Sequence, residues 1–204
     1  LSIKGTECAI VAHSAAITPI RSRNPRVSED SQQHSENPDV VMSGTRMLPP
    51  EIIFENELSL HLDGLQVDLQ HRAGSNHAGI WVTIPERKVV FVGDSVVVEQ
   101  PPFLAYANLQ TWEADLEDLC SDKYRDYLVV SSRSGMVDGD QVKAMIKQIS
   151  NIRKTFDPLK ENNAPLEEWH NQIPQLLGMF SQLDLFNSEL FYNRLHWGIT
   201  TYFE

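Results

Sequence analysis

Apolar and polar residues alternate along two consecutive stretches of the chain. From Glu57 to Leu62 every second residue is a leucine, which is the pattern of a strand with one buried and one wet face. A second such run extends from Leu65 to His71, and Asp63-Gly64 between the two runs predicts a tight hairpin. Shorter apolar runs at 9–12, 52–54 and 127–130 predict further strands.

A second hairpin is expected between Ile80 and Val92. The runs Ile80–Ile84 and Val89–Val92 are rich in β-branched and aromatic residues, and the polar turn Pro85–Lys88 joins them. The second run ends on Gly93 and Asp94. An ionised carboxylate is costly to bury unless it is paired or bound to a metal, and strand ends in layered α/β folds often carry sites. Asp94 is therefore either a turn or cap residue or part of a functional site.

The second half of the chain has helical periodicity. Residues 108–119 predict a helix capped by Asn108, and a longer helix is expected from Asp138, capped by Asp140 and broken at Asp157-Pro158. Further helices are expected at 167–177, with an interruption near Pro174, and at 187–202. The first helix also carries carboxylates that we expect on a solvated face: Glu113, Asp115, Glu117 and Asp118. Strands followed by helices predict an α/β fold.

Composition limits the class of protein. A chain of 204 residues that is 41% hydrophobic can bury one sizeable core, so we expect one domain over residues 1–204. A net charge of −11 without a Lys/Arg run argues against nucleic acid or an anionic membrane as the main partner. No apolar run approaches the ~20 residues of a membrane span and no signal peptide is visible, so a cytoplasmic location is expected. Cys8 and Cys120 have no ligand spacing and are expected to be buried thiols.

Two parts of the sequence carry little chemical information. Residues 21–44 are polar and without periodicity, which predicts a long loop or a disordered segment. No phosphate-binding glycine loop and no G-x-S-x-G elbow is present. Ser75 or Ser95 as a nucleophile would need a positioned base, which the sequence does not reveal.

The segment IPERKVVFVGD, from Ile84 to Asp94, resembles a motif of the metallo-β-lactamase fold superfamily. In that family a histidine-bearing loop precedes a strand, a turn of the type LPEEKVLF, and a second strand ending in VGD. The resemblance extends more loosely from about Cys8 to about Tyr202. It implies the later part of an αββα sandwich with C-terminal helices.

The resemblance also implies candidate metal ligands. Asp94 occupies the position of the family's metal-binding and catalytic aspartate. An ungapped count places Ser75 where the loop histidine is expected, so His77 takes that role only if the loop is shortened. Catalytic zinc sites need three protein ligands, and Asp94 and His77 supply two. The expected cofactor is zinc, with iron or manganese as alternatives, or no metal.

A third family motif is altered. Where the family has a GHG turn, this chain reads Ser132-Arg133-Ser134, with Arg133 in the histidine position. A guanidinium has no lone pair for a metal, so Arg133 is expected to neutralise a nearby carboxylate, namely Asp94. Together with Ser75 and Ser95, and with Phe103 from the loop that follows, these residues are expected to line a pocket.

The family's main metal motif, H-x-H-x-D-H, is absent from residues 1–50, where His13 and His34 are isolated. The chain begins at Leu1, and its first segment, GTECAIVAHSAA, resembles the strand that follows that motif. The resemblance therefore implies an N-terminally incomplete domain, with the motif upstream of Leu1.

Three functions stay open at this stage. The first is a hydrolase-like protein with a degenerate or incomplete metal site and a retained ligand pocket. The second is an active metal-dependent hydrolase of an ester, lactone or phosphodiester, whose missing histidines lie upstream; the third is a non-catalytic interaction module. The expected partner is a small-molecule substrate or ligand, and a homodimer stays open.

Overall fold

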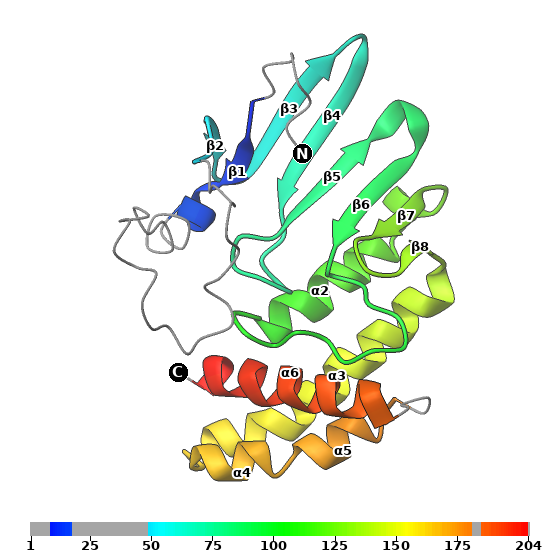
Figure 1. The fold of residues 1–204 in the computed structure, drawn as a ribbon. Coiled ribbons are helices and arrows are strands. Elements are labelled where there is room, and N and C mark those ends of the chain that lie inside the picture. Colours follow the sequence, from blue (N-terminus) through cyan, green and yellow to red (C-terminus); the bar gives the residue numbers. More distant parts are fainter. Residues whose placement is uncertain (1–8, 18–48, 181–184, 204) are drawn as a thin grey trace. The chain divides into compact units, whose positions relative to one another are not determined.

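The structure is a computed structural model that describes residues 9–17, 49–180 and 185–203 (Figure 1). The predicted loop at 21–44, Cys8 and His34 lie outside the described residues. The chain divides into two compact units, Leu1–Glu55 and Asn56–Glu204. Each unit is described by itself below.

The first unit contains a small parallel strand pair. Strand β1, Val11–His13, pairs with β2, Ile52–Phe54, so the strand predicted at 9–12 lies slightly later in the chain. His13 Nδ1 accepts a hydrogen bond from the Ala15 N–H, and Nε2 lies 2.6 Å from the Glu55 carbonyl oxygen. The buried imidazole also packs edge-on against Phe54, so His13 has a structural place in this unit.

A six-stranded sheet forms the β layer of the second unit, and its strands follow chain order (Figure 1). The strands are β3 Glu57–Leu62, β4 Leu65–His71, β5 Ile80–Ile84, β6 Val89–Gly93, β7 Leu128–Ser131 and β8 Gly135–Val137. Neighbours pair antiparallel except β6 and β7, which are parallel. Both predicted hairpins are confirmed, and Lys88 takes a left-handed conformation in the second turn. Strand β8 was not predicted.

Five α-helices are described in the second unit. They are α2 Leu109–Leu119, α3 Gly139–Glu161, α4 Leu166–His170, α5 Ile173–Leu177 and α6 Leu185–Phe203. Asn108 caps α2 as predicted, because its side chain accepts a hydrogen bond from the Thr111 N–H. Across the described ranges no helix combines the length and the apolar character that a membrane crossing requires.

Two helix predictions were wrong, and a third, an interruption near Pro174, was confirmed. The cap of α3 is Asp138 rather than Asp140, since Asp138 forms a reciprocal capping box with Gln141. Pro158 does not break α3, because buried residues such as Phe156 hold that part of the helix against the core. The interruption between α4 and α5 precedes Pro174, which occupies the first turn of α5, where its missing N–H costs nothing.

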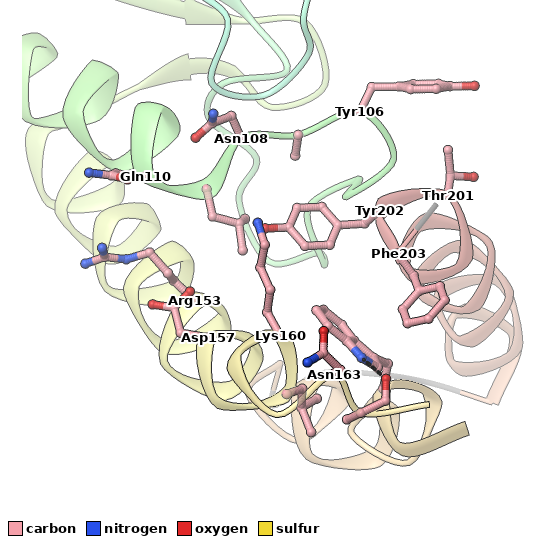
Figure 2. A pocket seen from close by; sticks show the side chains of 15 residues that line it. Tyr106, Asn108, Gln110, Arg153, Asp157, Lys160, Asn163, Thr201, Tyr202 and Phe203 are labelled. Carbon is pink, nitrogen blue, oxygen red and sulfur yellow. Dashed lines mark hydrogen bonds between the residues drawn. The ribbon is translucent and has the colours of Figure 1, made fainter. Parts of the chain in front are cut away.

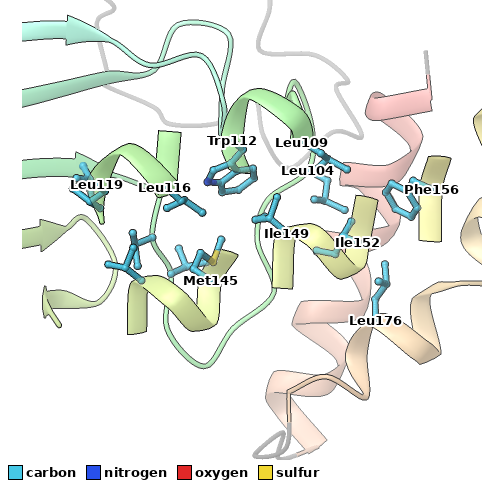
Figure 3. Close-up of a cluster of buried hydrophobic side chains, with 14 of the residues drawn as sticks. Leu104, Leu109, Trp112, Leu116, Leu119, Met145, Ile149, Ile152, Phe156 and Leu176 are labelled. Atoms are coloured by element: carbon cyan, nitrogen blue, oxygen red, sulfur yellow. The ribbon is translucent and has the colours of Figure 1, made fainter. Parts of the chain in front are cut away.

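One continuous core joins the sheet to the helices. Val90 and Val129 face each other across β6 and β7 and are buried on the helix side of the sheet. Figure 3 shows Trp112 of α2 and Ile149 of α3 inside this core. Cys120 is exposed, so the prediction of a buried thiol was wrong: Cys120 follows the last residue of α2, and Leu119 takes the buried position.

Candidate functional site

Strands β6 and β7 bring Asp94 and Arg133 together. The two strands are parallel and Gly93 lies opposite Ser131, so both strands end at the same edge of the sheet. Gly93 has a φ of +58°, which lets the chain turn sharply before Asp94. Arg133 Nε donates to Asp94 Oδ2 at 3.0 Å, and the Ser132 hydroxyl donates to Asp94 Oδ1. The ion pair expected from the sequence is therefore present.

The Asp94–Arg133 pair lies at the surface. The side chains are 41% and 48% exposed, and an exposed pair of this kind contributes about 0–1 kcal/mol to folding. Both carboxylate oxygens nevertheless have hydrogen-bond donors. The pair therefore has a defined geometry but contributes little to the stability of the fold.

The turn that carries Arg133 is tied to the chain after Asp94. The Ser131 hydroxyl donates to the Val96 carbonyl oxygen at 2.6 Å and accepts from the backbone N–H of Ser134 at 3.2 Å. The Ser134 hydroxyl in turn accepts from the Val98 N–H at 2.9 Å. These bonds fix the guanidinium of Arg133 beside Asp94 through neighbouring backbone.

A second arginine, Arg194 of α6, contacts the loop that follows Asp94. Its Nη1 donates to Gln100 Oε1 at 3.1 Å, and its guanidinium lies 5.8 Å from the centre of the Phe103 ring. Burial lowers the pKa of Arg194, the positive charge of Arg133 lowers it further, and Asp94 opposes both. Sequence reasoning missed Arg194, and its only signal was a cation within the apolar stripe of the last helix.

The three other predicted pocket residues lie in different surroundings. Phe103 packs against Trp197 with ring centres 5.0 Å apart, which places it beside Arg194. Ser95 is buried, and its hydroxyl accepts a hydrogen bond from Trp81 Nε1 at 2.9 Å. The Ser75 hydroxyl lies 3.4 Å from that of Ser95. The Ser95 hydroxyl is therefore the hydrogen-bond acceptor of a core indole.

The loop of His77 is held by contacts to His71 and Tyr106. The His77 carbonyl oxygen lies 2.9 Å from His71 Nε2, and its imidazole packs edge-on against Tyr106 at 5.4 Å. Within the described residues, no three His, Cys, Asp or Glu side chains gather as a metal site would require. Asp94 meanwhile directs both oxygens at Arg133 and Ser132. These residues by themselves do not make a three-ligand catalytic zinc site.

A partly buried ion-pair cluster anchors the same loop. Arg72 reaches Asp115 at 3.2 Å and Asp118 at 2.5 Å, and its guanidinium lies over Trp81. The Gly74 N–H also donates to Asp115. Asp115 is 7% exposed, so its expected place on a solvated helix face was wrong: Arg72, distant in sequence, covers it.

The pKa shifts in this cluster follow from burial and pairing. Burial tends to lower the pKa of Arg72, but its bonds to Asp118 and Asp115 outweigh that effect and raise it. Burial raises the pKa of Asp115 despite the opposing bonds from Arg72 and Gly74. The bond to the less buried Asp118 thus favours the charged form of the Arg72 guanidinium. The cluster attaches the loop to α2.

A cavity of about 620 Å³ lies between α2, α3 and α6 (Figure 2). This volume is typical of small-molecule sites. Tyr106 and Tyr202 line it together with Lys160 of α3, and burial followed by the charge of Asp157 raises the pKa of Tyr202. Asp94 and Arg133 do not line this cavity. Tyr106, whose ring packs against His77, and Asn108, whose N–H donates to the Gly74 carbonyl oxygen, link it to the His77 loop.

Comparison with solved structures identifies proteins of similar fold. No protein-family model and no curated protein matches the chain. The metallo-beta-lactamase from Pontibacter korlensis superposes with a TM-score of 0.52 at 17% identity, over 70% of this chain and 58% of that one. The DIM-1 metallo-beta-lactamase gives 0.51 at 15% identity, over 70% and 58%. The inverting sec-alkylsulfatase Pisa1 from Pseudomonas sp. gives 0.51 at 14% identity, over 76% and 27%.

The chain thus spans little more than half the length of these β-lactamases and about a quarter of the alkylsulfatase. At sequence identities this low, the structural likeness shows a shared fold and not a shared activity. The six-stranded sheet with its C-terminal helices agrees with the mixed α/β architecture predicted from the sequence. The chain has the metallo-β-lactamase fold.

Proposed function

We propose that the chain is a hydrolase-like protein of the metallo-β-lactamase fold whose Asp94 corner binds a ligand through protein side chains, without a metal held by the described residues. One observation carries the proposal: Arg133 and Ser132 donate to both oxygens of the Asp94 carboxylate. A metal ion at this position would need one of those oxygens as a ligand, and the positive charge of Arg133 would repel it. Ion pairing therefore takes the place of metal coordination.

The corner leaves donors for a ligand. Arg133 uses Nε for Asp94, and the two terminal amino groups of its guanidinium can donate to a planar or tetrahedral acceptor. Asp94, itself held by the Ser132 hydroxyl, orients the guanidinium, and this lowers the conformational entropy lost when a ligand binds. Phe103 and Trp197 supply an aromatic surface close to Arg194, beside the same corner.

The alternative function is a metal-dependent hydrolase acting on an ester, lactone or phosphodiester. Structural likeness to proteins named metallo-beta-lactamases favours it. In that case Asp94 and His77 would need further histidines from outside the described residues. The metal would supply an activated water and polarise the substrate.

The metal content of the purified protein separates these functions. We expect well under one equivalent of zinc, iron or manganese by elemental analysis, and no saturable zinc binding by calorimetry. Arg133→His should introduce measurable zinc binding, because an imidazole then stands beside Asp94 without a competing charge. Arg125→His is the matched control, since Arg125 is an exposed arginine paired with Asp122 elsewhere. One tightly bound equivalent in the unaltered protein, lost in Asp94→Asn, would overturn the proposal.

A further inference from the structure

The corner carries more positive than negative charge. Arg133 pairs with Asp94 at the end of β6, and Arg194 of α6 contacts Gln100 and Phe103 in the loop that follows Asp94. The charge of Arg133 lowers the pKa of Arg194, so the two guanidinium groups repel each other. An arrangement of two cations and one carboxylate favours the arrival of a second anion.

Arg194 contributes mainly through its field. Its Nη2 is buried and has no hydrogen-bond partner within the described residues, and its Nη1 is used by Gln100. A partly buried guanidinium is poorly solvated, so its charge acts more strongly on a neighbouring group than a surface charge does. Arg133 by contrast is 48% exposed and can contact a ligand directly.

Asp94 already shows what the guanidinium binds. Its carboxylate takes one hydrogen bond from Arg133 and one from the Ser132 hydroxyl, which is how an oxyanion of a ligand would be held. The carboxylate also repels any second anion. Its removal should therefore strengthen anion binding, whereas removal of a metal ligand would weaken metal binding.

Resting on the proposed function, we infer that the ligand of this corner carries an anionic oxygen group, a carboxylate, phosphate or sulfate, which Arg133 contacts while the charge of Arg194 lies behind it. Arg133 is the contacting residue and Arg194 is a positioning residue.

The test is a calorimetric titration with inorganic phosphate, at constant ionic strength and in the presence of a chelator. Asp94→Asn should bind phosphate about fivefold tighter or more, because a unit charge at about 4 Å is worth about that factor even in water. Arg133→Gln should bind at least tenfold more weakly. Asp126→Asn is the matched control: Asp126 is exposed and paired with Lys88, so this variant changes the net charge equally and should bind as the unaltered protein does.

Arg194 is tested by Arg194→Lys and Arg194→Met, with circular dichroism to verify folding. Lysine keeps the charge and should retain most of the affinity, and methionine should lose several-fold while keeping the apolar contact with Phe103. If methionine unfolds the protein, the lysine variant and Gln100→Leu, which removes the partner of Nη1, still report on the guanidinium.

The outcomes separate the two proposals. Equal phosphate affinity in Asp94→Asn, Arg133→Gln and the unaltered protein would overturn the anion assignment while the metal-free corner stands. Equal tightening by Asp94→Asn and Asp126→Asn would reveal a general charge effect and also overturn it. Stoichiometric metal at Asp94 would overturn the proposed function itself.

Discussion

Gly74 is the residue that sets the approach of the His77 loop to α2. A Cβ built on Gly74 would lie 2.3 Å from Trp112 Cα and 2.8 Å from Asp115 Oδ2. The same glycine donates its N–H to Asp115, and Asn108 at the start of α2 donates to its carbonyl oxygen. A glycine is therefore required where backbone meets backbone.

Gly74→Ala is expected to lower the free energy of unfolding by about 3 kcal/mol, since neither the helix backbone nor the buried carboxylate can move aside cheaply. Chemical denaturation measures the loss. Gly139→Ala is the control, because its added Cβ meets nothing within 4 Å at the start of α3, and the free energy of unfolding should stay the same or rise. Equal effects of the two variants would contradict the close approach.

Helices α4 and α6 meet through a pair of imidazoles. The rings of His170 and His196 stack with centres 3.9 Å apart, and His170 Nε2 lies 3.0 Å from the Thr200 hydroxyl. Burial lowers the pKa of His170, and the charge of His196 lowers it further. The folded protein thus disfavours the doubly charged pair.

Because the pKa of His170 is lower in the folded than in the unfolded chain, the unfolded chain binds more protons below about pH 6.5. The contribution of His170 to the free energy of unfolding is therefore present above that pH. It is lost as the pH falls from the pKa of the unfolded chain towards the lower pKa of the folded chain. Denaturation at a series of pH values should show this fall, and His170→Gln should reduce it. A pH profile that is unchanged in the variant would contradict the assignment.

At the scale of the whole molecule, the C-terminal helices share one core with the sheet. Ile199 and Leu195 of α6 are buried in the same cluster as Trp81 of β5 and Trp112 of α2. No separate apolar centre for α6 is found within the described second unit. Sheet and helices should accordingly unfold together.

Ile199→Ala is expected to cost about 2–5 kcal/mol, the range for a large core side chain cut to alanine. Tryptophan fluorescence and far-ultraviolet circular dichroism should give the same shifted midpoint. Leu190→Ala serves as control, since Leu190 is 53% exposed on the same helix and should change little. A midpoint that shifts in one signal only would reveal that α6 unfolds independently.

The sequence by itself determined the local elements and one long-range pair. The hairpins β3–β4 and β5–β6 follow from alternation and turn residues, because neighbouring strands need only short-range information. The Asn108 cap of α2 is equally local. The pairing of Arg133 with Asp94 was predicted through the family motif, which encodes the strand ends that the parallel pair β6–β7 brings together.

Only the tertiary structure decided which charged residues matter. Asp115 reads as one of several exposed carboxylates until Arg72, 43 positions away, covers it. Arg194 reads as a lone cation within the apolar stripe of the last helix until α6 brings it to Gln100, 94 positions away. Burial and electrostatic coupling depend on what packs against a side chain, and a single sequence does not state which distant segments meet.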